Sequence, residues 1–336
     1  WALTDDLSLL TGLRFNYDEK KVDFQRTVSG GAPLETPMLL ALRNAQYSNQ
    51  AFKADITDDN LTGTVTLNYA VTDAINLYGT YSTGFKPVGL NLGGLPTDAG
   101  RIMTELSIIK PEYVQHYELG LKTSPFDNTT LNFVVYQTDI EDYQAQVQTA
   151  DIAVNRGYLA NAEAVQVKGF EVDARVRLNS ITLQASYAYT DGKYKKFTNA
   201  PLPLEQVGAP VSFIDISGGR LPGISKSAFS ITGEYSRPLT LLGASGEVFG
   251  GLDAYYRSEF SSSASPSQYL NIDAYTLLNA RVGFRTDDSW SAFLWSRNLT
   301  DKDYFEQLLP GAGNAGHYAA VLGDPRTWGA TVRYSF

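Results

Sequence analysis

The chain has 336 residues, of which 43% are hydrophobic, and it contains 29 Gly, 21 Tyr and 16 Phe but no Cys. Its formal net charge of -9 argues against nucleic acid as a partner, because no basic face is available to neutralise phosphates. No apolar run reaches the 18 or so residues of a transmembrane helix, and the absence of cysteine excludes disulfides and thiolate metal sites.

Twelve segments alternate like β-strands along the chain. The clearest early example is segment 60–70, where Leu61, Val65 and Leu67 oppose Thr64 and Thr66. A side-chain period of two is the period of a strand. The predicted strands are 6–17, 60–70, 75–85, 112–123, 129–141, 163–178, 181–191, 227–237, 246–258, 274–286, 289–299 and 326–336.

Segment 163–178 indicates what the two faces meet. One face carries four charged residues in a row, Glu171, Asp173, Arg175 and Arg177, and the other carries Phe170, Val172 and Val176. Such a charged row is very costly against a dry core but costs little against water. We therefore expect the charged face to line a wet lumen and the apolar face to meet lipid, as in a transmembrane barrel.

The last segment ends the chain on an aromatic residue. Trp328, Ala330, Val332, Tyr334 and Phe336 share one face, and Arg333 lies on the other. An exposed soluble edge strand rarely carries so many aromatic residues, whereas barrel strands place them at the membrane interfaces. We read this segment as the closing strand of a barrel, with Arg333 in the lumen and Val332 and Tyr334 toward lipid.

The connections alternate between long and short. The long ones are 18–59, 86–111, 142–162, 192–226, 259–273 and 300–325, and the short ones are 71–74, 124–128, 179–180, 238–245 and 287–288. This alternation predicts antiparallel up-and-down topology, with every long loop at the outer end and every short turn at the periplasmic end. Phe336 is then expected on the periplasmic side.

Four stretches resemble the TonB-dependent outer-membrane receptors. They are Asn76–Pro87 (NLYGTYSTGFKP), Lys110–Lys122 (KPEYVQHYELGLK), Val167–Asp173 (VKGFEVD), and Arg297–Tyr304 with Gly323–Gly329 (RNLTDKDY and GDPRTWG). They occur in the family's order and are similar to its strand, loop and closing-hairpin motifs. The resemblance covers nearly the whole chain from about Asp6.

The resemblance implies an all-β, antiparallel up-and-down transmembrane β-barrel, of which about 12 strands of an expected 22 are present. Residues 1–336 are expected to be the C-terminal portion of the barrel, without the N-terminal plug, the first barrel strands or the TonB box. The implied function is active uptake in the outer membrane of a Gram-negative bacterium, with a ferric siderophore as the default ligand. The implied partners are lipid and lipopolysaccharide, that ligand, and periplasmic TonB through the missing N-terminal region. No cofactor and no enzymatic activity are expected.

Two other functions remain open at this point. A self-contained twelve-stranded barrel, acting as a passive pore or an autotransporter domain, would need no missing half. A barrel enzyme such as an outer-membrane phospholipase would need a Ser–His pair, and no serine is marked out beside His116 or His317.

The candidate ligand-binding residues lie on the expected lumen wall and outer loops. They are Phe85, Lys86, His116, Tyr143, Tyr158, Phe305, His317 and Tyr318. Aromatic side chains in outer loops could form a platform for a planar ligand, and the two histidines could contact it. No metal site is expected, because no His or carboxylate pair has the spacing of one.

Overall fold

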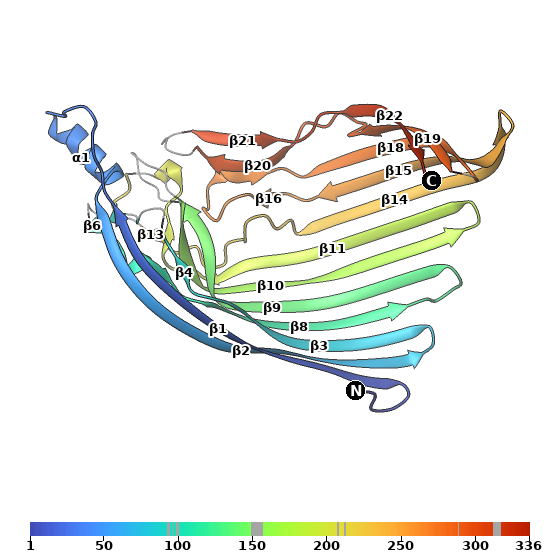
Figure 1. The fold of residues 1–336 in the computed structure, drawn as a ribbon, viewed down its shortest axis with the longest axis horizontal. Helices are drawn as coiled ribbons and strands as arrows, with labels where there is room; N and C mark the ends of the chain where they lie inside the picture. Colours follow the sequence, from blue (N-terminus) through green and yellow to red (C-terminus); the bar gives the residue numbers. More distant parts are fainter. Residues whose placement is uncertain are drawn as a thin grey trace.

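The computed structural model is one large, curved, twisted antiparallel sheet (Figure 1). It describes residues 1–92, 95, 97–98, 101–148, 157–206, 208–211, 213–287, 289–311 and 317–336. The strand order in the main sheet is β1-β2-β3-β8-β9-β10-β11-β14-β15-β18-β19-β22, so each strand pairs with its neighbour along the chain. This confirms the predicted up-and-down, all-β architecture.

All twelve predicted strands are present. Their bounds are β1 (Leu7–Arg26), β2 (Gln50–Thr72), β3 (Ile75–Lys86), β8 (Glu112–Thr123), β9 (Thr129–Gln148), β10 (Gly157–Leu178), β11 (Ile181–Lys196), β14 (Ser227–Leu241), β15 (Ala244–Arg257), β18 (Tyr275–Thr286), β19 (Trp290–Arg297) and β22 (Thr327–Tyr334). Asn128 and Asn179 adopt positive φ at the tight turns, a conformation that asparagine tolerates better than most residues.

The remaining elements belong to the long connections. They are α1 (Pro37–Gln46), β4 (Gly89–Leu90), β5 (Thr97–Asp98), β6 (Arg101–Ile102), η1 (Thr104–Leu106), β7 (Ile108–Ile109), β12 (Ala200–Pro201), η2 (Leu204–Gln206), β13 (Phe213–Ile214), β16 (Phe260–Ser261), η3 (Gln268–Leu270), β17 (Asn271–Ile272), β20 (Phe305–Pro310) and β21 (Tyr318–Leu322). Figure 1 shows them gathered at one end of the sheet, opposite the tight turns and both termini. No helix in the described ranges is long and apolar enough to cross a membrane.

The predicted loop 18–59 is shorter than expected. β1 continues to Arg26 and β2 begins at Gln50, and only the segment between them is a connection, which includes α1. The extended part carries charge on the face that is apolar lower down, with Lys21 3.4 Å from Asp55 and Lys53 2.7 Å from Asp23. The alternation of apolar and polar residues stops where the apolar face becomes charged. The sequence pattern therefore does not predict that the strands extend through this part.

The strand register carries one face across the sheet. Glu171 pairs with Ala188, Ala188 with Ala228, and Ala228 with Arg257. The same face continues through Arg285, Ser291 and Arg333 at the other end of the sheet. The registers therefore put the predicted charged residues Glu171, Asp173, Arg175, Arg177 and Arg333 on a common face.

That face also carries a cluster of ion pairs. Arg281 lies 3.1 Å from Asp253 and 3.2 Å from Glu234, and Arg285 lies 3.0 Å from Glu234 and 2.9 Å from Glu247. On the opposite face Phe170 lies 5.7 Å from both Tyr187 and Tyr189, measured between ring centroids. We assign the charged face to the lumen and the aromatic face to lipid, because charge near the lipid midplane is destabilising.

A hydrophobic cluster covers the lumen face at the loop end of β9, β10 and β11. Its fully buried members include Ala162, Val165, Tyr194 and Phe197, and Leu221 packs with them from the connection before β14. The loop after β11 thus folds back over the inner wall and is held there by apolar burial.

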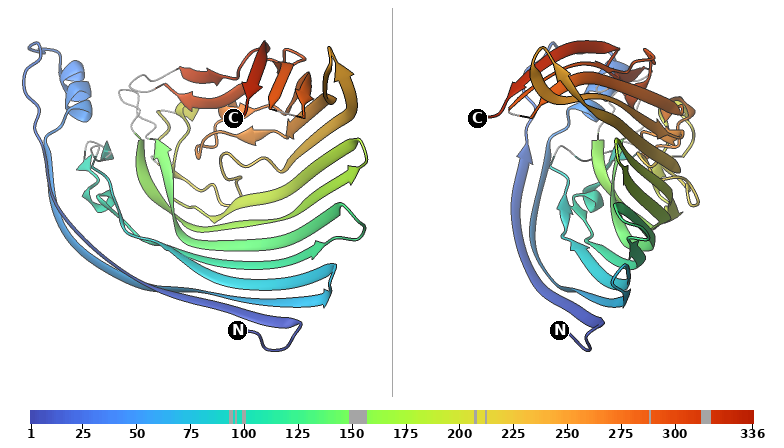
Figure 2. Two further views of the ribbon diagram at one scale, coloured as in Figure 1. Left: turned by 45° about the vertical axis from the view of Figure 1, so that its right-hand side comes forward. Right: turned by 90° about the vertical axis from the view of Figure 1, so that its right-hand side faces the viewer.

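The sheet does not close on itself. β1 and β22 are the two ends of the strand order, and no ladder joins them. Figure 2 shows the resulting trough, open along these two strands. The expectation that strand 326–336 does not pair with strand 6–17 is confirmed.

The face assignment predicts unequal effects at neighbouring positions of β10. Val172→Arg should lower the free energy of unfolding in lipid by about 2–4 kcal/mol if the site lies at the membrane midplane. Asp173→Arg should cost much less, because that side chain faces the lumen. Urea unfolding in lipid vesicles measures both, and equal losses would contradict the assignment.

Candidate ligand-binding site

The outer rim of strands β3, β8, β9 and β10 is built around a buried carboxylate. The Glu112 side chain is only 8% exposed, and Lys86 Nζ lies 3.0 Å from its Oε1. The backbone N–H of Gln144 donates to the same oxygen at 2.7 Å. Both partners are needed here, because a buried charge is costly unless it is paired and hydrogen-bonded.

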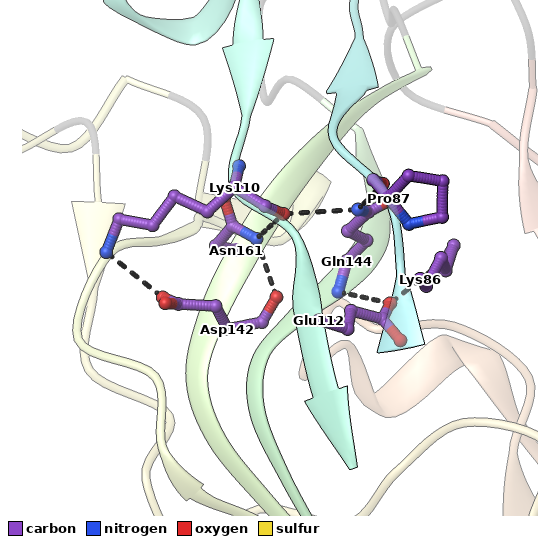
Figure 3. A network of polar contacts seen from close by, with 7 residues as sticks. All are labelled: Lys86, Pro87, Lys110, Glu112, Asp142, Gln144 and Asn161. Atoms are coloured by element: carbon purple, nitrogen blue, oxygen red, sulfur yellow. Dashed lines mark hydrogen bonds and ion pairs between the residues drawn. The ribbon is translucent and has the colours of Figure 1, made fainter. Parts of the chain in front are cut away.

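Two amide side chains join the four strands above this carboxylate (Figure 3). Gln144 Nε2 donates to the carbonyl oxygens of Pro87 at 2.8 Å and Lys110 at 3.1 Å. Asn161 Nδ2 donates to the carbonyl oxygens of Lys110 at 3.1 Å and Asp142 at 2.6 Å, and its Oδ1 accepts from Lys110 N at 2.9 Å. These bonds satisfy backbone groups where the ladder becomes irregular, and they fix the position of Lys86.

Tyr143 and Tyr158 lie behind this rim, in the hydrophobic cluster. The Tyr143 ring is 6.5 Å from that of Tyr194, and Tyr158 is 6% exposed. A tilted strand crosses a membrane in about 9–11 residues, so Tyr158 lies well beyond the spanning part of β10. Burial raises the pKa of Tyr158 to about 12, which keeps the phenol neutral. Both rings support the rim by packing.

His116 stands on the lumen face of β8, below the rim. Its Nδ1 lies 2.8 Å from Thr138 Oγ1, and its Nε2 lies 3.4 Å from Glu118 Oε2. The Tyr78 hydroxyl donates to Glu118 Oε1 at 2.8 Å. His116 is therefore one member of a hydrogen-bonded polar row on the wall.

Tyr318 belongs to a second group, which joins three long loops. Its hydroxyl donates to Glu205 Oε2 at 2.6 Å and lies 3.3 Å from Ser267 Oγ. Burial alone would raise the pKa of Glu205, but hydrogen bonds from Tyr318, Ser267 and backbone N–H groups hold that pKa below its ordinary value. The Tyr269 ring packs 5.4 Å from that of Tyr318.

The other three candidate residues lie outside both groups. Phe85 is on the lipid-facing side of β3, with its ring 5.7 Å from that of Tyr113. Phe305 is 41% exposed at the start of β20. His317 is exposed, and its carbonyl accepts from Gly311 N at 2.9 Å. The structure thus pairs Lys86 with Glu112 at the rim, places Tyr143 and Tyr158 in the hydrophobic cluster, and leaves Tyr318 in a separate loop cluster.

Several site residues are not among those predicted from the sequence. Glu112 lies inside the quoted Lys110–Lys122 motif, and its position after Pro111 at a strand start was the available signal. Gln144, Asn161 and Glu205 gave no signal, because their partners lie far away in the sequence. Among the residues that the structure describes, no three His, Cys, Asp or Glu side chains are grouped as metal ligands.

Comparison with known proteins gives a consistent family. A family model described as TonB dependent receptor-like, beta-barrel, matches residues 1–299. The ferric-pyoverdine M114 receptor PbuA of Pseudomonas sp. (strain M114) is 27% identical over 348 residues, which cover 99% of this chain and 35% of that protein. The probable TonB-dependent siderophore receptor PiuA of Acinetobacter baumannii is 24% identical, over 82% of this chain and 34% of its own length.

Solved structures show the same fold. The ferric yersiniabactin uptake receptor FyuA from Yersinia pestis superimposes with a TM-score of 0.74 at 18% identity, and the match covers 100% of this chain and 44% of that structure's chain. The chain spans about a third of the length of the curated relatives given above.

The buried carboxylate of the rim predicts a stability effect. Glu112→Ala should lower the free energy of unfolding by about 1–3 kcal/mol, because it leaves the Gln144 N–H without its partner. Glu19→Ala is the matched control, since it removes only an exposed ion pair with Lys21 and should cost about 0–1 kcal/mol. Denaturant unfolding in lipid vesicles compares the two, and similar losses would show that the rim does not depend on Glu112.

Proposed function

We propose, because the chain belongs to the TonB-dependent receptor-like β-barrel family, that it forms part of the wall of a receptor that actively takes up a scarce ligand. The family is one of Gram-negative outer membranes, and that is where the chain resides. The match of the family model to residues 1–299, on a wall with one polar and one apolar face, carries this proposal.

The ligand we propose is a ferric siderophore. The relatives named above are a ferric-pyoverdine receptor and a probable siderophore receptor, and the similar solved structure is a ferric yersiniabactin uptake receptor. Uptake would draw energy from TonB, and the surrounding lipid and lipopolysaccharide would contact the apolar face. The protein would make or break no bond in the ligand.

We further propose that residues 1–336 are the C-terminal portion of a larger barrel. The open edges of β1 and β22 support this, because unpaired backbone groups in lipid cost several kcal/mol each. The relatives are about three times as long as the chain, enough for about ten further strands and a plug. A self-contained twelve-stranded pore would instead need β1 and β22 to pair.

The structure suggests distinct roles for the candidate residues. Lys86 is half exposed at the rim and would present an ammonium group to an anionic ferric complex. The Tyr318 cluster would hold three outer loops in position for capture. His116 would contact the ligand from the lumen wall, and Phe305 and His317 would do so from the last outer loop. Phe85, Tyr143 and Tyr158 would stabilise the rim around the ligand.

Uptake of iron-55 complexes tests this function. Cells that express the protein should accumulate one ferric siderophore far above a deletion strain, and a protonophore or loss of TonB should abolish the difference. Accumulation that is unaffected by the protonophore would favour the passive pore. No accumulation of any ferric siderophore would contradict the proposed ligand class.

A further inference from the structure

The lumen wall contains a hollow that none of the candidate residues touches. Two neighbouring rows of the register form it across five strands, β10, β11, β14, β15 and β18. The outer row is Glu171, Ala188, Ala228, Arg257 and Tyr275, and the inner row is Asp173, Ser186, Ser230, Tyr255 and Leu277.

Small side chains in the middle of both rows create the hollow. Alanine and serine occupy β11 and β14, whereas carboxylates stand on the β10 side and tyrosines on the β15 and β18 side. The resulting space is about 480 Å³, which is within the range of small-molecule sites. Its residues on β14, β15 and β18 lie at the loop ends of those strands, whereas its residues on β10 and β11 lie nearer the tight turn between these two strands.

The charge of the hollow is negative. Glu171 and Asp173 are both exposed, and neither forms an ion pair within the described part of the chain. Ser186 Oγ donates to Asp173 Oδ1 at 2.6 Å, which orients that carboxylate. Arg175 is the next residue of β10 on this face and lies one row nearer the turns. It does not line the hollow.

Arg257 is held away from the two carboxylates. Its Nη2 donates to the Gly223 carbonyl at 2.9 Å, and its Nε donates to Ser225 Oγ at 3.1 Å. Its guanidinium also lies 3.9 Å from the centre of the Phe260 ring. These contacts hold the Arg257 guanidinium at the loop end of the row. It therefore does not neutralise Glu171 and Asp173.

The opposite wall is aromatic. Tyr255 is 46% exposed on the lumen face, and the Tyr275 ring packs against Tyr304 with centroids 4.7 Å apart. Ring faces attract organic cations and pack against flat apolar groups.

We infer that this hollow binds a small organic cation, with its ammonium group at Glu171 and Asp173 and its flat apolar part against Tyr255. The inference rests on the proposed function, in which the lumen is the route of uptake. It adds a preference for ligands that combine a free amine with a planar group.

Tyramine is a suitable probe, because it carries one ammonium group on one phenol ring. The protein is purified whole from outer membranes and placed in lipid nanodiscs, and saturation-transfer NMR measures the dissociation constant. Tyramine should bind, and N-acetyltyramine, which is neutral, should bind at least about tenfold more weakly. Glu171→Gln with Asp173→Asn should weaken tyramine binding by a similar factor.

Glu19→Gln is the control, because Glu19 lies on the other face of the sheet and outside the hollow. The affinity of the Glu19→Gln variant for tyramine should equal that of the wild type. Should the double variant fail to fold, Glu171→Gln alone replaces it, since Glu171 forms no ion pair within the described residues.

Two results would overturn the inference. One is an absence of tyramine binding to the wild type, as expected if a basic segment of the same protein fills the hollow. The other is equal affinity in the double variant and the control. Neither result bears on iron uptake, so failure of this site and failure of the proposed function remain distinguishable.

Discussion

The hydrogen-bond ladder between neighbouring strands is the constraint on which the rest of this structure depends. Lipid offers no partner to a backbone N–H or carbonyl group, so every strand that crosses it must pair on both sides. Pairing fixes the register, and register fixes which side chains share a face. The polar wall and the aromatic outer face both follow from this pairing, and the open edges of β1 and β22 are the two places where residues 1–336 do not meet the requirement.

The register also explains how residues far apart in sequence come to act together. Glu234, Asp253 and Arg281 occupy three strands, yet consecutive ladders place them side by side on the lumen face. The hollow in the wall has the same origin, because alanine and serine fall opposite one another on β11 and β14. Both features are built on strands of the sheet, and for the hollow the loops supply only the contacts that hold Arg257 and Tyr275.

Much of this architecture could be predicted from the sequence, because a period of two is visible wherever one face meets lipid. The alternation is lost in the outer parts of β1 and β2, where Lys21 and Lys53 replace apolar residues on that face. The partners of Glu112 and Tyr318 leave no trace in the sequence, since Gln144 and Glu205 reach them only through folding. Phe85 is among the expected loop aromatics, although the alternation along β3 puts it beside Tyr113 on the lipid-facing side.

The extended hairpin of β1 and β2 has a mechanical consequence. β1 has 20 residues, and at roughly 3.3 Å per residue it is about twice as long as the part needed to cross the membrane. Force applied outward at its tip, near α1, would run along the strand axes. Such a force would shear all the hydrogen bonds of the ladder at once and would not break them one after another. The hairpin should therefore resist pulling as a stiff beam and transmit tension from the cell exterior directly into the membrane-embedded wall.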